Sequence, residues 1–209
     1  MHAEKHDIVM LGFAGARIAL TLADLHREEL QSRFPRHFLK LEDELQKGIR
    51  TLSELDFLQE KHSDLFCNLA ENCLVVLREE EVFPALWKLA EGLDAGLDVT
   101  LRSIPISQFV IEVCEWLDVN PYVNMTALEN CKCFGDRVTR TEGKETSLCN
   151  IRDYETTVYG LLIATDEPEE LLAFAQANEI PSAVIGRLTD KNDRVVRNGE
   201  IIRYLTPEG

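Results

Sequence analysis

Short apolar runs alternate with amphipathic helical patterns along this chain, and no other feature restricts its possible folds as strongly. Four runs have the length and composition of β-strands, at residues 7–11, 73–77, 159–164 and 183–188. Between such runs, apolar residues recur three and four positions apart, which is the spacing of one helix face. Sheets and amphipathic helices bury their apolar faces best against one another. The sequence therefore predicts a mixed α/β fold, with a mixed sheet covered by helices.

Several helical patterns begin at a recognisable residue. The apolar stripe at 38–45 predicts one helix, and Ser53 is expected to open the next, since serine caps exposed N–H groups at a helix start. Ser107 is the expected cap of a further helix that follows. Pro168 marks the start of a helix that is expected to run to about residue 178, because proline suits the first helical turn.

Glycines indicate where other elements end. An apolar stripe at 83–93 predicts a helix, and we expect Gly92 and Gly96 to end it, since glycine adopts the left-handed conformation at little cost. Near the end of the chain, residues 195–205 are typical of a β-hairpin. The pair Asn198-Gly199 predicts a type I′ turn at its centre.

Charge excludes some classes of partner. The net charge is −15, with a pI near 4.7. Nucleic acids and anionic membrane surfaces both need a positive patch, so neither is an expected partner. The N-terminus does not resemble a secretory leader, and no apolar run reaches the roughly 18 residues of a membrane span. We therefore expect a cytoplasmic protein whose six cysteines stay reduced.

A long polar segment at 126–157 interrupts the alternating pattern and carries three of the six cysteines. Cys131, Cys133 and Cys149 are candidate zinc ligands, with a fourth ligand from elsewhere, because thiolates suit this metal. Their spacing does not match the usual zinc knuckles. Basic neighbours could instead lower a thiol pKa and make a reactive cysteine, or the three thiols could simply face solvent.

One motif resembles a known family. Residues 104–122 read IPISQFVIEVCEWLDVNPY, which resembles the C-terminal domain of the hydrogenase maturation factor HypE, in the superfamily of aminoimidazole ribonucleotide (AIR) synthetase, PurM, and selenophosphate synthetase. Similar stretches occur in family order at 7–15, 85–93, 160–165 and 183–190. The matching motif positions are Ile104, Pro105, Ile106, Gln108, Glu112, Cys114, Asn120, Pro121 and Tyr122.

The resemblance implies a single AIR synthase-related C-terminal-like domain over residues 1–209, with an insertion loop at about 126–157. It also implies a partly ferredoxin-like topology. In the family, an N-terminal ATP-binding domain precedes this one and supplies much of the phosphate and magnesium contact. We expect that domain to be missing from this chain.

The glycine loops that bind phosphate in the family are altered here. Glu79 matches a family loop, but Glu80 and Glu81 stand where the family has two glycines. Carboxylates at an anion-binding corner repel a nucleotide. The turn that contains Gly12 and Gly15 is likewise followed by residues that depart from the family pattern. The three glutamates could form an acid/base site, but solvating the start of a helix is their more ordinary use.

The family's terminal cysteine, which carries the cyanide-group chemistry in HypE, also has no counterpart at the end of this sequence. We therefore expect no catalytic residues, and we do not expect ATP or Mg²⁺ to bind the isolated chain. The expected function is that of an accessory, regulatory or assembly factor, which forms a homo-oligomer or binds a protein partner. Two alternatives remain open: half of a split ATP-dependent enzyme completed by a separate ATP-binding chain, and a cysteine-based metal or redox module.

Overall fold

The computed structural model describes residues 6–17, 20, 26–33, 36–53, 73–77, 82–116 and 158–207. In this part of the chain, one mixed sheet of seven strands has the order β2-β4-β1-β5-β3-β6-β7. Neighbouring strands are antiparallel except β3 and β6, which run parallel. The strands are β1 (Asp7–Gly12), β2 (Leu74–Leu77), β3 (Gly96–Thr100), β4 (Gly160–Thr165), β5 (Ser182–Thr189), β6 (Arg194–Asn198) and β7 (Ile201–Tyr204).

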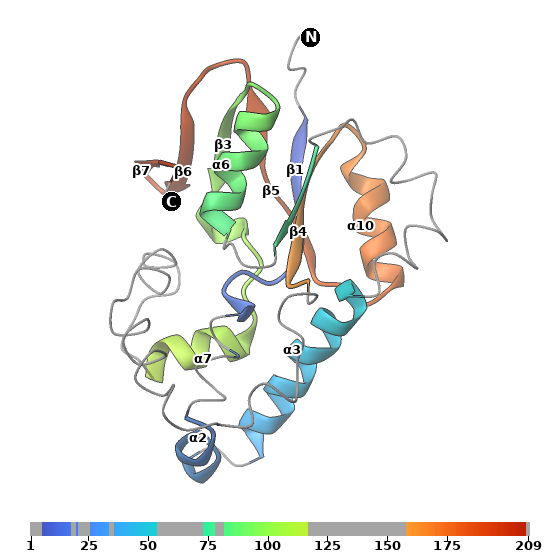
Figure 1. The fold of residues 1–209 in the computed structure, drawn as a ribbon, viewed down its shortest axis with the longest axis vertical. Helices are drawn as coiled ribbons and strands as arrows, with labels where there is room; N and C mark the ends of the chain where they lie inside the picture. The colour runs from blue at the N-terminus through green and yellow to red at the C-terminus, as the bar shows by residue number, and fades with distance from the viewer. Residues whose placement is uncertain are drawn as a thin grey trace, which may run out of the picture.

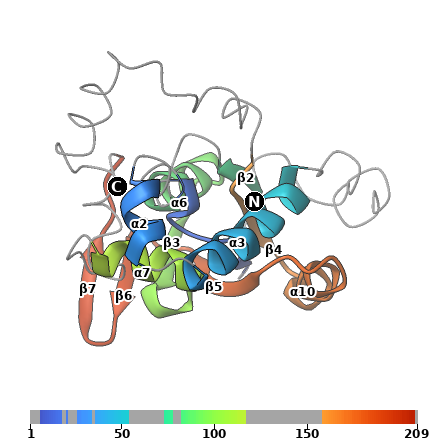
Figure 2. The same cartoon turned by 90° about the horizontal axis from the view of Figure 1, so that it is seen from below.

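Helices cover both faces of the sheet, on opposite sides in Figures 1 and 2. On one face, α6 (Val82–Gly92) packs its buried side chains against alternate residues of the strands, including Ile8 and Met10 of β1. On the other face, α10 (Pro168–Ala177) packs against Val9 and Leu11 of the same strand. Because successive strand residues point to opposite faces, β1 is buried on both sides from Ile8 to Leu11, and these four residues are all apolar.

Three further helices lie beyond one end of the sheet (Figure 1): α2 (Arg27–Arg33), α3 (His37–Ser53) and α7 (Gln108–Trp116). A short 3₁₀ helix, η1 (Leu101–Ser103), connects β3 to the segment before α7. The guanidinium of Arg27 donates hydrogen bonds to both carboxylate oxygens of Glu42, at 2.6 and 3.3 Å, and so ties α2 to α3. Glu42 is buried, and the amide of Gln46 donates to it as well.

The predicted α/β fold is confirmed, and every strand and helix predicted above within the described residues is present. Two details are wrong, one here and one in the hairpin described below. Ser53 is the last residue of α3, and the helix that it was expected to open lies outside the described residues. The left-handed residue after α6 is Asp94, with φ of +50°, whereas Gly96 is already in β3. A β-carbon added at Gly96 would lie 1.7 Å from the carbonyl oxygen of Lys191. Glycine is therefore required at this position because another backbone segment approaches closely.

The hairpin turn is displaced by one residue from the predicted position. Asn198 pairs with Ile201, which leaves Gly199 and Glu200 as the two-residue loop. Gly199 has φ of +62°, but neither Asn198 nor Glu200 has a positive φ. A type I′ turn needs two such residues, so the predicted turn type is wrong.

None of the helices in the described ranges combines the length and apolar character that crossing a bilayer requires. Cytoplasmic localisation and the organisation of residues 1–209 as one domain stay predictions.

Candidate functional site

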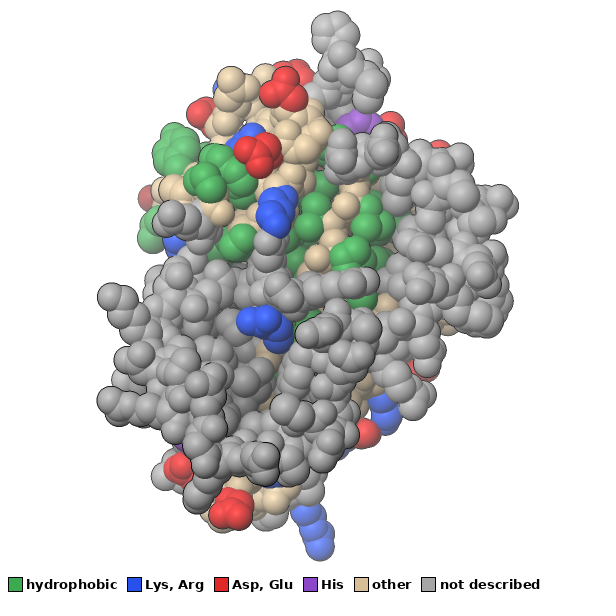
Figure 3. Space-filling view, in the orientation of Figure 1, with side chains coloured by type: hydrophobic (Ala, Val, Ile, Leu, Met, Phe, Trp, Pro, Cys, Tyr) green, Lys and Arg blue, Asp and Glu red, His purple; other side chains and the backbone are tan. Residues whose placement is uncertain are grey.

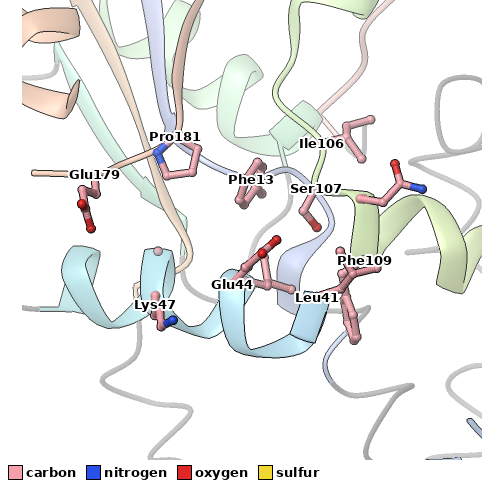
Figure 4. Close-up of a pocket in the computed structure, with 12 residues that line it drawn as sticks. Phe13, Leu41, Glu44, Lys47, Ile106, Ser107, Phe109, Glu179 and Pro181 are labelled. Atoms are coloured by element: carbon pink, nitrogen blue, oxygen red, sulfur yellow. The ribbon is translucent and has the colours of Figure 1, made fainter. Parts of the chain in front are cut away.

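A pocket of about 470 Å³ lies where β1 leaves the sheet, between α3 and the start of α7 (Figure 4). We call it the α3–α7 pocket. Four segments far apart in the sequence contribute to it: the end of β1, α3, the segment that enters α7 and the loop between α10 and β5. Its lining residues are Phe13, Leu41, Glu44, Leu45, Lys47, Gly48, Ile106, Ser107, Gln108, Phe109, Glu179 and Pro181.

The turn after β1 holds one wall in place through its backbone. The N–H of Gly12 donates to the carbonyl of Pro181 at 2.7 Å, and the N–H of Ala14 donates to the carbonyl of Pro105 at 2.9 Å. Phe13 lies between these two bonds and lines the pocket. Because the turn is bonded on both sides, the positions of the α10–β5 loop and of the α7 entry are fixed relative to β1.

Gly12 and Gly15 are required by the geometry of this turn. Gly12 has φ of +93°, and a β-carbon there would lie 2.6 Å from the carbonyl oxygen of Tyr159. Gly15 has φ of +69°, and its β-carbon would meet Val110 of α7 at 3.1 Å. L-residues with side chains rarely adopt these φ values. Both glycines therefore have a role in packing the chain, independent of any ligand.

The start of α7 forms a second wall. Ser107 is buried, and its hydroxyl oxygen accepts a hydrogen bond from the N–H of Val110 at 3.1 Å, so the predicted cap is confirmed. This bond satisfies one of the N–H groups that a helix start would otherwise offer to an anion. Ile106 and Phe109, on either side of the cap, turn apolar surface to the pocket.

The rim on α3 carries charges that are already paired. Lys40 lies 3.7 Å from Glu44, and the ammonium of Lys47 lies 2.8 Å from the carboxylate of Asp43. The pKa of Lys47 is raised above its ordinary value, first by its hydrogen bond to Asp43 and by the charge of that carboxylate, then by Glu44 and Glu179. Glu179 reaches the rim from the opposite side in Figure 4.

This arrangement suits an apolar group better than a phosphate. Leu41, Leu45, Ile106, Phe109 and Pro181 give the interior its hydrocarbon character. Among the described lining residues, Lys47 is the one cation, and Asp43 already holds it. Two carboxylates, Glu44 and Glu179, share the lining, so a polyphosphate would meet like charge at the rim. Binding through apolar contact is therefore the chemistry that the pocket supports.

Only two of the site residues predicted from the sequence fall within the described part of the chain. Gly12 and Gly15 lie in the turn that forms one wall of the pocket. Glu79, Glu80 and Glu81 lie outside the described residues, as do Cys131, Cys133 and Cys149. In the ranges that are described, no group of three or more His, Cys, Asp or Glu side chains is placed to hold a metal ion. The zinc prediction is not tested by this.

Sequence reasoning did not identify the α3 wall or the loop at 179–181. Both depend on a contact between segments some 130 residues apart, which periodicity does not show. One local signal was present: Gly48 lies in the middle of α3, where glycine is unfavourable unless close packing needs it. A β-carbon at Gly48 would lie 3.6 Å from Pro181, which is an ordinary contact distance, so this glycine marks the place where α3 meets the 179–181 loop.

Comparison with known proteins gives no match to a protein-family model and none to a curated protein sequence. Solved structures do match. The hydrogenase maturation protein HypE of E. coli superposes with a TM-score of 0.54 at 14% identity, covering 99% of this chain and 50% of that one. A HypE–HypF complex gives a TM-score of 0.51 at 12% identity, covering 96% of this chain and 52% of the matched chain.

This chain thus spans about half the length of the structures it matches. Identities this low establish a shared fold and not a shared activity. The resemblance inferred from residues 104–122 is confirmed at that level. In its fold, this chain is similar to about half of the hydrogenase maturation protein HypE.

Proposed function

We propose that this protein is an accessory or assembly factor that binds another protein through the α3–α7 pocket and performs no ATP chemistry of its own. The observation that carries this proposal is the character of the pocket. Its interior is apolar, and its lining lysine, Lys47, is paired with Asp43. The hydroxyl of Ser107 already accepts the hydrogen bond of the Val110 N–H. A partner's apolar side chain fits such a site, whereas a nucleotide needs free donors and cations.

The comparison with solved structures supports a protein partner. One of the matching structures is a complex of HypE with HypF, so a protein of this fold has been observed bound to another protein. The fold itself does not specify the partner. Its identity, and any role in hydrogenase maturation, belong to the proposal.

Site-specific photocrosslinking tests whether the pocket contacts a protein. Gln108 lies at the rim of the pocket, and Glu170 lies exposed on α10, on another part of the surface. We expect benzoylphenylalanine at position 108 to crosslink a defined protein in the producing cell, and the same group at position 170 to give no such product. Identical products from both positions, or none from position 108, would count against the pocket.

Calorimetry with ATP and Mg²⁺ tests the second half of the proposal. The purified chain is expected to give no saturable heat at millimolar nucleotide and no phosphate release. Micromolar binding would show that nucleotide recognition persists in this fold.

A split enzyme is the second candidate. In that case ATP hydrolysis appears only when this chain is mixed with a separate ATP-binding chain. Co-purification of the two, with ATPase activity confined to the mixture, would establish it. The third candidate, a metal or redox module built on Cys131, Cys133 and Cys149, predicts zinc or iron in protein purified without chelators, which elemental analysis measures directly.

A further inference from the structure

The β7 strand exposes most of the large apolar side chains that are open to solvent in the described part of the chain. Ile201, Ile202 and Tyr204 are 69%, 45% and 63% exposed, and Val184 of β5 is the remaining large hydrophobic residue in this group. Figure 3 shows hydrophobic side chains gathered at the upper left of the molecule, where Figure 1 places β6 and β7. β7 is also the last strand in the order of the described sheet.

The register of the hairpin shows which backbone groups of β7 point away from the sheet. Asn198 and Ile201 close a two-residue loop, and Arg203 pairs with Val196. The N–H of Leu205 donates to the carbonyl of Arg194 at 2.8 Å, which continues the same alternation of bonded pairs. In an antiparallel ladder, bonded and non-bonded pairs alternate. The N–H and C=O groups of Ile202 and Tyr204 therefore face outward along the edge.

Side-chain contacts to α6 and to β3 stabilise the position of the β6–β7 hairpin. The guanidinium of Arg194 lies 4.0 Å from the centre of the Trp87 ring, and that of Arg203 lies 5.7 Å from the Phe83 ring. Both rings belong to α6. On the opposite face, Arg197 donates to the carboxylate of Asp98 in β3 at 2.7 Å. These contacts fix β6 and, through Arg203, β7 relative to the rest of the fold, and the edge strand of a sheet is a template for strand addition.

Charge indicates what kind of strand fits. The chain as a whole carries −15, yet the edge presents Arg203 between two apolar residues, Ile202 and Tyr204. A strand that lies antiparallel to β7 places one residue directly opposite Arg203, in the closely spaced non-bonded position. An acidic residue there is favourable, and a basic residue is unfavourable.

The same argument disfavours pairing of β7 with a second copy of this chain. The register that sets Ile202 opposite Tyr204 of the second copy also sets Arg203 opposite Arg203. A register that pairs Ile202 with Ile202 of the second copy avoids placing the two arginines opposite each other. It instead places Glu200 opposite Tyr204. The first register therefore contains an unfavourable pair of like charges, and the second lacks the favourable apolar pair of Ile202 with Tyr204.

We propose that β7 is a docking edge that binds an extended segment of a partner protein by β-strand addition, and that this segment carries an acidic residue flanked by apolar residues. The backbone of Ile202 and Tyr204 supplies the hydrogen bonds, and their side chains supply the apolar contact. Arg203 selects the acidic residue. This surface is separate from the α3–α7 pocket, so it stands whether or not the pocket binds a protein.

Nuclear magnetic resonance titration of the ¹⁵N-labelled chain tests this proposal with two synthetic peptides. The first is acetyl-Ser-Thr-Val-Glu-Val-Thr-Ser-amide, and the second has lysine in place of glutamate. We expect the glutamate peptide to bind about 1.4- to fivefold more tightly, which is the fold-change that corresponds to roughly 0.2–1 kcal/mol for a cross-strand charge pair. We also expect the amides of Ile202 and Tyr204 to become protected from exchange, while those of Ile201 and Arg203 are protected throughout.

Two variants separate a docking edge from non-specific contact. Ile202→Pro removes an outward N–H and leaves the bonds to β6 in place, so it should abolish binding of the glutamate peptide while the spectrum of the rest of the sheet is preserved. Arg203→Glu should reverse the preference in favour of the lysine peptide. Equal binding of both peptides to the unmodified chain would overturn the proposal, and so would chemical-shift changes that map away from β6 and β7. It would also be overturned if the unmodified chain self-associates and the Ile202→Pro variant does not.

Discussion

Single residues fix the walls of the α3–α7 pocket, and Gly12 shows how. Its φ of +93° and the 2.6 Å approach to the carbonyl of Tyr159 leave no room for a side chain. Gly199, in the β6–β7 loop, shares a positive φ of +62° but has no atom within 4 Å of its β-carbon position. The two glycines therefore differ in crowding more than in backbone conformation.

Gly12→Ala is expected to destabilise the protein by about 2 kcal/mol or more, from left-handed strain together with overpacking against Tyr159 and Leu52. Urea unfolding followed by circular dichroism measures this. Gly199→Asn is the matched control, since asparagine tolerates the left-handed region and the site is open. Equal losses in the two variants would mean that the crowding at Gly12 is relieved by a small shift of the chain.

The buried carboxylate of Glu42 gives a second prediction at this scale. Among the described contacts, Arg27→Ala leaves Glu42 with the amide of Gln46 and removes the cation paired with it at the α2–α3 contact. We expect a loss of about 2 kcal/mol, lower than for a fully buried pair because Arg27 is partly exposed. Lys40→Ala, which breaks the exposed pair with Glu44, should change the unfolding free energy by less than about 0.5 kcal/mol. Similar losses of unfolding free energy in the two variants would show that the pair of Arg27 with Glu42 contributes no more than an exposed ion pair.

At the scale of elements, α7 depends on its first turn. Ser107→Ala removes the hydroxyl that accepts the N–H of Val110 and leaves that group without its cap. The expected cost is about 1 kcal/mol. Ser32→Ala on α2 is the control, because that hydroxyl is exposed and donates to the carbonyl of Glu29. A loss confined to Ser107→Ala in thermal unfolding supports the cap; an equal loss in both does not.

Gly48 lowers the stability of α3, because glycine is unfavourable in the interior of a helix. A β-carbon there meets only ordinary contacts, at 3.6 and 3.8 Å from Pro181. Gly48→Ala should therefore stabilise the protein by about 0.5–1 kcal/mol, since glycine in a helix interior costs that much relative to alanine. Destabilisation in differential scanning calorimetry would mean that α3 and the 179–181 loop lie closer together than described.

The elements were largely predictable from the sequence because their signals are local. The β1 run DIVML is apolar on both faces, and Ser107 precedes a helical stripe, so both were identified correctly. The errors occurred where a tertiary contact decides. Gly96 is glycine because the chain at Lys191 passes over it, and not because it ends α6. The turn at Gly199 moved by one residue because the register of β6 and β7 overrode the Asn-Gly preference.

At the scale of the whole molecule, the candidate site was less predictable than the fold. The turn with Gly12 and Gly15 was singled out as an altered family loop that was not expected to bind a cofactor, and Phe13 within it lines the pocket. Its partners in the pocket lining, α3 and the loop at Glu179, are far from it in the sequence and come together only in the folded chain. Such a contact leaves no periodic trace in the sequence. The similarity to HypE was visible from the motif at 104–122, and four of its residues, 106–109, line the same pocket.

The central claim is that the α3–α7 pocket binds a protein, and one pair of variants tests it most directly. Gly48→Leu extends a side chain from α3 into the pocket, whereas Gly48→Ala changes the same position without filling it. Affinity is measured for the partner captured by crosslinking at position 108, with the unmodified chain as reference. We predict at least a tenfold loss for Gly48→Leu and an unchanged affinity for Gly48→Ala. Full affinity in a correctly folded Gly48→Leu variant would contradict the account.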